Sequence, residues 1–270
     1  MRLQQKVVLV TGASGGIGWA TCERLASEGA RVVGTSRRRP QALAGSDVLR
    51  VGPGEVRFVP GDVTSQASLG SVVEEAVDAY GRLDGVFANA GVLHAGGVLD
   101  ATEAEWAASV EVNLTAVWRT VRAAVPAMLA AGRGGSVVVN SSVQGRRGIA
   151  GFGAYTATKF GAVGLAQALA QDLAAHSIRV NSVLPTSVDT PMINGAEHRR
   201  RMTGGSDSHE DQQALYRGAH LLPIGWIDPV DVANAVLWLL SEESRYVTGV
   251  DLPVDAGYLA KAVAPEPLRS

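Results

Sequence analysis

A tyrosine and a lysine stand four residues apart in the run Tyr-Thr-Ala-Thr-Lys, as Tyr155 and Lys159. If this run is helical, both side chains lie on one face, so that an ammonium can approach a phenol. A phenol ordinarily has a pKa near ~10, and a nearby positive charge lowers that pKa towards the range useful for proton transfer. Such a pair also occurs by chance on surface helices. The rest of the chain must therefore decide whether this pair is catalytic.

A glycine-rich segment precedes the first predicted helix. It reads Thr11-Gly12-Ala13-Ser14-Gly15-Gly16-Ile17-Gly18, follows a short apolar run, and opens a helical segment that we expect to reach about Glu28. Glycines permit a tight turn and let backbone amides and the helix N-terminus approach a diphosphate. Loops also use glycine for conformational reasons alone, but the position between strand and helix favours a nucleotide site. The turn does not end in Gly-Lys-Ser/Thr, which argues against phosphoryl transfer.

The end of the second predicted strand indicates which dinucleotide is bound. An acidic side chain there holds the ribose hydroxyls of NAD, whereas a basic one accommodates the additional phosphate of NADP. The chain has Thr35, Ser36, Arg37 and Arg38 at this point, with no carboxylate. We therefore expect NADP(H), with Ser36 and Arg37 as contacts. One alternative is NAD(H). The other is that these residues form a solvated basic loop that binds no cofactor.

Seven short apolar runs predict strands, at residues 6–10, 30–34, 55–60, 84–88, 135–140, 178–184 and 249–254. Helical segments alternate with them, so the expected fold is a single α/β domain over 1–270 with a doubly wound, mostly parallel seven-stranded sheet and helices on both faces. Residues 40–54 are expected to form a surface loop. Asp228 and Pro229 predict the start of a helix, as cap and first residue.

Polar and small residues follow several of these strands. Asp62 and Val63 follow the third, where an adenine edge could be recognised, although Asp62 could equally be a turn carboxylate. Asn89-Ala90-Gly91 follows the fourth; its small residues let the backbone lie against a cofactor, and the Asn89 amide can hold strand ends together. Asn113 stands near the start of a helix that we expect over 113–131, where it could act as a cap.

The helix that contains Tyr155 continues almost without charge as far as Asp172. A helix that is apolar nearly all round must be covered on both faces, by the sheet and by something else. A second subunit is the simplest cover, so we expect a homo-oligomer, a tetramer or a dimer. The more polar stretch at about 190–225 is expected to form a mobile lid over the substrate.

Composition excludes several classes of function. The 270 residues carry a formal net charge of -2, which argues against binding to nucleic acid. The lone Cys22 cannot form an intrachain disulfide, and the N-terminus lacks the apolar segment of a signal peptide. No apolar run has membrane-spanning length, so a cytoplasmic protein is expected. His198, His209 and nearby carboxylates lack a compact ligand spacing, so no metal site is expected.

Taken together, the motifs resemble those of the short-chain dehydrogenase/reductase family. They are Thr-Gly-x-x-x-Gly-Ile-Gly from Thr11, Asn-Ala-Gly from Asn89, Asn113, Ser142, and Tyr-x-x-x-Lys from Tyr155. The resemblance covers nearly the whole chain, and it implies a Rossmann-type fold in which a hydride passes between a nicotinamide and a substrate carbon.

The resemblance also implies a role for each catalytic residue. Tyr155 exchanges a proton with the alcohol or carbonyl oxygen, and Ser142 donates a hydrogen bond to that oxygen. Lys159 binds the nicotinamide ribose and lowers the pKa of the tyrosine, while Asn113 holds a water in a proton relay. The expected cofactor contacts are Gly12, Ser14, Gly16, Ile17, Gly18, Ser36, Arg37, Asp62, Val63, Asn89, Ala90, Gly91, Tyr155, Lys159, Pro185, Val188 and Thr190. The expected substrate contacts are Ser142, Gln144, Phe152, Tyr155, His94 and Met192, of which Gln144, Phe152, His94 and Met192 could equally be plain lining or core.

A narrower similarity lies in the C-terminal half. Residues 185–193 and 222–257 resemble the carveol-dehydrogenase-like, mycofactocin-associated branch of the family, which implies oxidation of a cyclic or terpenoid secondary alcohol with tightly held NAD. The sequence departs from that branch at the second strand, where the expected acid is missing, so only the substrate class is carried over.

The expected function is therefore hydride transfer between NADP(H) and a ketone/secondary alcohol pair that is cyclic or otherwise bulky. One alternative is an NAD-dependent alcohol dehydrogenase of the carveol-dehydrogenase-like type. Another is a non-catalytic, cofactor-binding regulator, because a fold does not fix an activity. An epimerase or dehydratase of the longer branch is disfavoured by the short C-terminal part.

Overall fold

Eight strands form one sheet at the centre of the computed structural model, which describes residues 1–262. The strands are β1 (Val7–Thr11), β2 (Arg31–Ser36), β3 (Val48–Val51), β4 (Gly54–Pro60), β5 (Gly85–Ala88), β6 (Gly135–Asn140), β7 (Ile178–Pro185) and β8 (Asp251–Val254). Their order across the sheet is β3-β4-β2-β1-β5-β6-β7-β8, and every neighbouring pair except β3 and β4 is parallel. The predicted doubly wound fold is confirmed.

The predicted count of seven strands is wrong by one. The additional strand, β3, lies within residues 40–54, which were expected to form a loop. It pairs antiparallel with β4, with Leu49 opposite Val56, and forms the edge of the sheet. The Gly52-Pro53-Gly54 turn joins the two strands, and Gly52 has a φ of 59°, which glycine adopts readily. The strand has only four residues, so the alternation of buried and exposed positions that marks a strand is too short to recognise among its glycine-rich neighbours.

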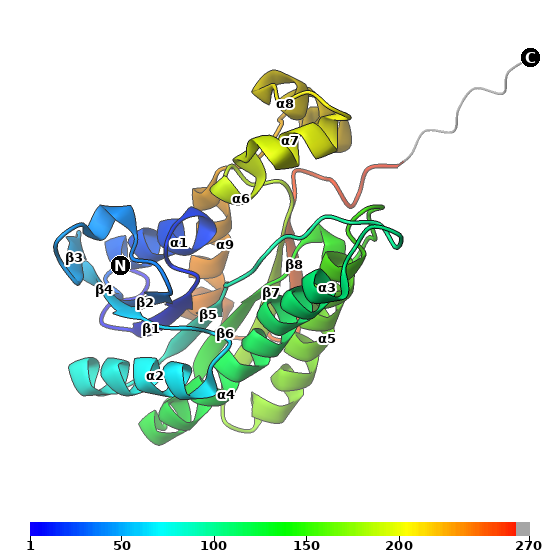
Figure 1. Ribbon diagram of the computed structural model, residues 1–270. Coiled ribbons are helices and arrows are strands. Elements are labelled where there is room, and N and C mark those ends of the chain that lie inside the picture. The colour runs from blue at the N-terminus through cyan, green and yellow to red at the C-terminus, as the bar shows by residue number, and fades with distance from the viewer. Residues whose placement is uncertain (263–270) are drawn as a thin grey trace, which may run out of the picture.

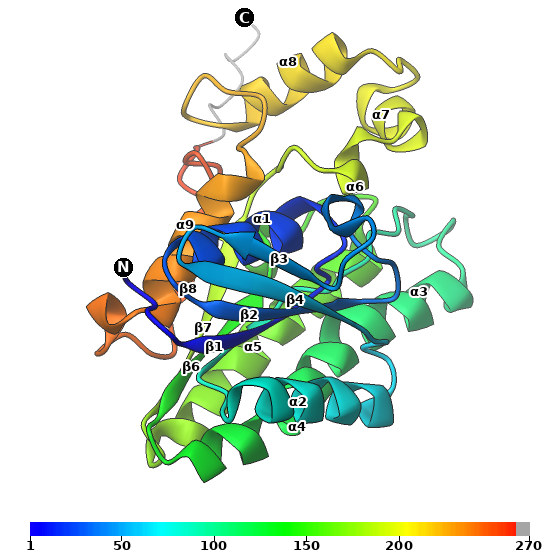
Figure 2. The same cartoon turned by 90° about the vertical axis from the view of Figure 1, so that its left-hand side faces the viewer.

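Helices cover both faces of the sheet (Figures 1 and 2). One face carries α1 (Gly16–Ser27) and α9 (Pro229–Leu240), whose apolar residues pack with Val8, Val10 and Val138. The other carries α2 (Gln66–Tyr80), α4 (Ala116–Ala131) and α5 (Gly153–Ala174), which pack on Leu9, Val137 and other residues of the opposite face. Strands covered on both sides explain the nearly continuous valine runs in the sequence.

The helix that ends with α4 starts earlier than predicted. It begins with α3 (Glu103–Val110), passes through a π-helical turn at Glu111–Thr115, and continues as α4. Thr102 is the true cap, because its hydroxyl accepts from the amide of Glu105 while the Glu105 carboxylate accepts from the amide of Thr102. The predicted capping role of Asn113 is therefore wrong. The predicted start of α9 is confirmed, with Asp228 as cap and Pro229 as first residue.

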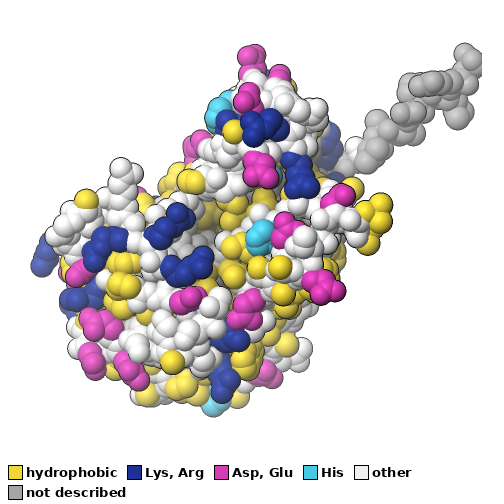
Figure 3. All heavy atoms as spheres, viewed as in Figure 1, with side chains coloured by type: hydrophobic (Ala, Val, Ile, Leu, Met, Phe, Trp, Pro, Cys, Tyr) yellow, Lys and Arg dark blue, Asp and Glu magenta, His cyan; other side chains and the backbone are white. Residues whose placement is uncertain are grey.

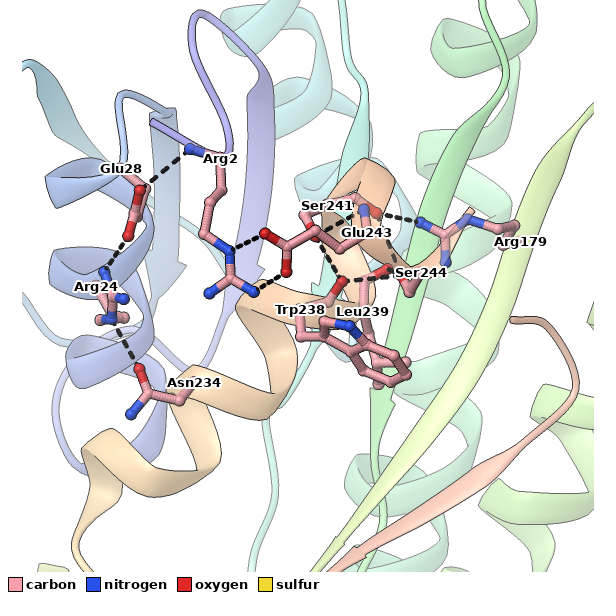
Figure 4. Close-up of polar contacts among 10 residues, drawn as sticks. All are labelled: Arg2, Arg24, Glu28, Arg179, Asn234, Trp238, Leu239, Ser241, Glu243 and Ser244. Carbon is pink, nitrogen blue, oxygen red and sulfur yellow. Dashed lines mark hydrogen bonds and ion pairs between the residues drawn. The ribbon is translucent and has the colours of Figure 1, made fainter. Parts of the chain in front are cut away.

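Polar contacts join the start of the chain to α1 and α9 (Figure 4). The backbone amide of Arg2 donates to Glu28, which follows α1, and the Arg2 guanidinium pairs with Glu243, just beyond α9. Arg24 on α1 also donates to Asn234 on α9, at 2.8 Å. These exposed contacts contribute little stability singly, so the apolar layer beneath them holds the two helices.

Three short helices stand above the carboxyl ends of the strands (Figure 1). They are α6 (Pro191–Asn194), α7 (Ala196–Thr203) and α8 (His209–Ala219), and they occupy most of the segment predicted to be a lid. No helix in residues 1–262 is long and apolar enough to cross a membrane.

Cys22 lies in the middle of α1 and is fully buried. A Cβ added at Gly34 would lie 3.3 Å from its sulfur, so α1 packs closely on β2 at this point. Burial raises the pKa of the thiol, which keeps it protonated and unreactive at neutral pH.

Candidate active site

A cavity of about 940 Å³ opens at the carboxyl ends of the strands, below α6 to α8. Its walls include Gly12 after β1 and Asn89 after β5, the neighbouring strands from which the chain runs in opposite directions across the sheet. Ligands of open α/β sheets bind at this switch point. In Figure 3 hydrophobic side chains gather in the hollow beneath α6 to α8. The cavity is therefore the candidate site.

Every predicted cofactor contact and every predicted substrate contact lines this cavity. Of the four predicted catalytic residues, Ser142, Tyr155 and Lys159 line it and Asn113 does not. The residues come from six strand ends and the start of α5, so the fold brings together side chains that lie far apart in the sequence.

The glycine-rich turn forms a cradle that larger residues would fill. Gly12 has a φ of 71°, and a Cβ there would lie 2.9 Å from the Cα of Ala90. A Cβ at Gly18 would lie only 2.3 Å from the carbonyl oxygen of Gly12. At Gly16 a Cβ would lie 3.1 Å from Thr190. The turn therefore leaves backbone amides and the start of α1 facing the cavity, an arrangement that fits a dinucleotide diphosphate.

The end of β2 offers hydroxyl and guanidinium groups. Ser36, Arg37 and Arg38 line the cavity, and the Ser36 hydroxyl donates to the Arg38 carbonyl at 2.6 Å. Asp62, across from them, accepts from the amide and the hydroxyl of Thr64, and these bonds together with the charge of Arg37 hold the pKa of the carboxyl below its usual value. Asp62 is thus a turn carboxylate that also lines the cavity.

Asn89 ties three strand ends together. Its side-chain amide donates to the Thr11 carbonyl at 2.9 Å, and its oxygen accepts from the Asn140 amide at 2.9 Å. Its backbone amide donates to the Thr11 hydroxyl at 3.0 Å. The prediction that Asn89 holds strand ends together is confirmed, and the floor of the cavity is rigid as a result.

Ser142 and Tyr155 contact each other on the cavity wall. Ser142 follows β6, and its hydroxyl accepts from the Gln144 amide at 3.1 Å and lies close enough to the phenol of Tyr155 to lower its pKa. Tyr155 lies in the first turn of α5. Burial raises the pKa of Tyr155 to about 12, and the hydrogen bond from Ser142 opposes this effect.

Lys159 lies one turn further along α5 and is almost fully buried. Its Nζ donates to the backbone carbonyl of Asn140 at 2.8 Å and lies 5.4 Å from the centroid of the Tyr155 ring. Burial lowers the pKa of Lys159 to about 8. Burial is the largest cause acting on the pKa of Tyr155, and the ammonium of Lys159 donates to the Asn140 carbonyl. The lowering of this pKa by Lys159 stays a prediction.

Asn113 lies in the π-helical turn and is fully buried. Its side-chain oxygen accepts from the Val92 amide at 2.8 Å, and its amide donates to the Val92 carbonyl at 2.9 Å and to Thr158 at 3.4 Å. The side chain thus anchors the segment after β5. A Cβ added at Gly91 would lie 3.2 Å from Asn113 and 3.9 Å from Lys159, so this segment separates Asn113 from the cavity.

The part of the cavity beyond Tyr155 is largely apolar. Gln144 accepts from Thr156 at 2.7 Å, His94 contacts Ser109 at 3.1 Å, and both line this part together with Phe152 and Met192. Several further residues of its wall carry no signal in the sequence. They are Ile149, Ile193, His198, Met202, Leu215, Tyr216, Ala219 and Tyr258.

Comparisons with known proteins show the family of the chain. A family model described as Enoyl-(Acyl carrier protein) reductase matches residues 12–259. A protein of Mycolicibacterium smegmatis that is named only as a short-chain type dehydrogenase/reductase is 40% identical, over 96% of this chain and 99% of its own length. The chain belongs to the short-chain dehydrogenase/reductase family.

Two further members of this family are also similar. The (-)-trans-carveol dehydrogenase of Rhodococcus erythropolis is 39% identical, over 96% of this chain and 99% of its own length. The crystal structure of a carveol dehydrogenase from Mycobacterium avium in complex with NAD superposes with a TM-score of 0.89, at 38% identity, covering 96% of this chain and 99% of that one. The protein is accordingly an oxidoreductase of the short-chain dehydrogenase/reductase type that uses a nicotinamide dinucleotide.

Proposed function

We propose that the protein transfers a hydride between NADP(H) and a ketone/secondary alcohol pair whose carbon skeleton is cyclic or otherwise bulky. The observation that carries this proposal is the position of Tyr155 and Ser142. Both residues line the cavity that also contains the glycine cradle, and the Ser142 hydroxyl is close enough to the phenol to lower the pKa of Tyr155. A substrate oxygen at this point has a proton donor and an orienting hydroxyl beside it, and the nucleotide lies on the other side.

Each residue has a defined task in this proposal. The dinucleotide, when bound, accepts or supplies the hydride. Ser142 hydrogen-bonds to the substrate oxygen and fixes its direction, and Tyr155 gives a proton to that oxygen or takes one from it. Lys159 binds the nicotinamide ribose. The ribose would then take over part of the hydrogen bonding that the ammonium of Lys159 makes to the Asn140 carbonyl. Asn113 takes part in the proton relay through the backbone of its π-helical turn, since its side chain is already bonded to Val92.

The preference for NADP(H) rests on charge. Arg37 and Arg38 line the cavity at the end of β2, and no carboxylate is present at positions 35–38 to bind ribose hydroxyls. NAD(H) is the second candidate, favoured by the NAD bound in the structure of the carveol dehydrogenase from Mycobacterium avium. Titration of the purified protein with NADPH and with NADH decides between them, because tighter binding of NADH would refute the role assigned to Ser36 and Arg37.

The apolar wall beyond Tyr155 supports the proposal that the substrate is bulky. The relative from Rhodococcus erythropolis is named for a cyclic alcohol, carveol, and we extend that substrate class to this chain. Cyclic, aromatic and linear ketones assayed with both cofactors test the proposal. Turnover of linear ketones alone would contradict the substrate class, and binding of a dinucleotide without turnover of any ketone or alcohol would favour a regulator.

We also propose that the protein forms a homo-oligomer through α4 and α5. Trp118 on α4 and Phe160 on α5 are large apolar side chains that remain 42% and 46% exposed. The exposed positions of α5 before Asp172 include Gly164 and Ala168, which allow close approach of a second helix. Sedimentation at micromolar concentration tests this, and a monomer would contradict it.

A further inference from the structure

Two polar side chains, His198 on α7 and Tyr216 on α8, line the lid side of the cavity. The distance between His198 Nε2 and the Tyr216 hydroxyl is 3.0 Å. The lid residues around them are apolar and also line the cavity: Met192, Ile193, Met202, Leu215 and Ala219. The pair is therefore a polar feature in an otherwise apolar wall.

The pair lies close to the helix that carries the catalytic tyrosine. The ring of His198 packs against Phe152, with centroids 6.4 Å apart. Phe152 caps the N-terminus of α5, three residues before Tyr155. A ring-shaped substrate that places its reacting oxygen at Tyr155 and Ser142 therefore shares one cavity with His198.

Buried contacts fix the tyrosine of the pair. Gln212 is fully buried, and its amide donates to the Ile193 carbonyl at 2.9 Å and to the Tyr216 oxygen at 3.4 Å. Gln212 can only donate to this oxygen through its amide, and His198 Nε2 is the one acceptor within hydrogen-bond distance of the Tyr216 hydroxyl among the described residues, so the O–H of Tyr216 donates to His198 Nε2.

This direction of donation sets the tautomer of His198. Burial and the charge of Arg201 hold the pKa of His198 below its usual value, so the ring is neutral at pH 7. A neutral ring that accepts at Nε2 carries its hydrogen at Nδ1. No hydrogen bond within residues 1–262 uses this Nδ1–H. His198, which lines the cavity, thus carries an Nδ1–H that has no hydrogen-bond partner among the described residues.

We infer that His198 donates a hydrogen bond from Nδ1 to a second oxygen of the substrate, remote from the reacting carbon. The inference rests on the proposed function and narrows its substrate class to cyclic ketones and alcohols that carry a further hydroxyl, carbonyl or ether oxygen. A donor held in an apolar wall selects for a ligand that can accept from it, because otherwise the donor is left without a partner.

A pair of isosteric rings tests the inference. Cyclohexanone and tetrahydropyran-4-one differ in one position, where the second ring has an ether oxygen opposite the carbonyl. Their dissociation constants are measured by calorimetry on the protein saturated with the oxidised dinucleotide, so that no ketone is turned over. The ratio of the two constants isolates the contact with the ether oxygen.

The affinity for the ether-containing ring is expressed relative to the affinity for cyclohexanone. We expect this ratio to be roughly three- to tenfold lower in the His198→Leu variant than in the parent, the range for one neutral hydrogen bond. Its affinity for cyclohexanone should stay within about twofold of the parent's on the same grounds. The His198→Gln variant keeps a donor and should retain part of the preference. His209→Leu, the same change on α8 but outside the cavity, is the matched control and should retain all of it.

The outcomes separate this inference from the proposed function. An equal ratio in the parent and in the His198→Leu variant would overturn the inference and leave the reaction untouched. A preserved difference in binding, without hydride transfer to either ring under any condition, would refute the reaction and support the lid contact. If the parent bound neither ring, both proposals would fail.

Discussion

The ammonium of Lys159 donates to the backbone carbonyl of Asn140 at 2.8 Å. Asn140 is the last residue of β6, and its side chain donates to Asn89 beyond β5. The position of the ammonium is therefore set by the sheet as well as by α5. Tyr155 and Lys159 keep their relative position as long as α5 packs on β6 and β7.

Replacement of Tyr155 by Phe removes the proton donor and leaves the ring. We expect the turnover of ketones to fall by roughly 10²- to 10⁴-fold, the usual contribution of a positioned acid or base, with little change in cofactor affinity. The measurement is the steady-state rate with the better cofactor. Tyr80→Phe is the matched control, because Tyr80 lies on α2 and donates to Glu55 away from the cavity. Parent-like turnover by Tyr155→Phe would refute the mechanism.

Burial of Lys159 makes stability depend on pH. Its pKa is about 8 in the folded protein and ~10.5 when unfolded, so between these values the unfolded chain binds more protons. The free energy of unfolding should therefore rise with pH in this window. We expect the rise from pH ~8 to ~10 to be larger by about 2 kcal/mol in the parent than in Lys159→Met. Urea denaturation of both proteins without cofactor measures this difference, and parallel pH profiles would contradict it.

The glycine cradle predicts a position-dependent effect of alanine. A Cβ at Gly18 would lie 2.3 Å from the Gly12 carbonyl, so the turn must shift away from the diphosphate. We expect Gly18→Ala to weaken dinucleotide binding by on the order of tenfold or more and to destabilise the fold by about 1–3 kcal/mol. Gly15→Ala, whose Cβ would meet nothing within 4 Å, is the control. Fluorescence titration with the dinucleotide compares the two, and equal affinities would count against the cradle.

The charge at the end of β2 should decide between the two cofactors. Arg37→Asp replaces a guanidinium that lines the cavity by a carboxylate, which repels a phosphate and accepts from ribose hydroxyls. We expect the ratio of NADPH to NADH affinity to fall by about 10-fold or more, as for loss of a charged hydrogen bond. Arg39→Ala serves as control, since Arg39 pairs with Asp47 and does not line the cavity. An unchanged ratio in Arg37→Asp would refute the assignment.

The sequence was sufficient for the parts of the site that depend on local spacing. The glycines of the turn, the pair on α5 and the residues that follow each strand all lie where the pattern predicts, because a strand that ends at a buried edge delivers its next residue to the cavity. The role of Asn89 also follows from its place after a strand.

Long-range packing explains what the sequence did not show. β3 is a strand because β4 pairs with it, and its own four residues give no distinctive pattern. The helix starts at Thr102, well before Asn113, so Asn113 is not at a helix N-terminus and cannot cap one. Its side chain instead accepts from the Val92 amide. The contact of His198 with Tyr216 leaves no local pattern, because Tyr216 is 18 positions away on another helix.

The buried Cys22 has a practical consequence. It is the single cysteine of the chain, and close packing of α1 on β2 shields its thiol. A cysteine introduced at an exposed position of α7 would therefore react alone with a thiol-specific dye, without prior removal of the native one. A fluorophore attached there would report directly on whether the segment above the cavity closes when the dinucleotide and a ketone are added.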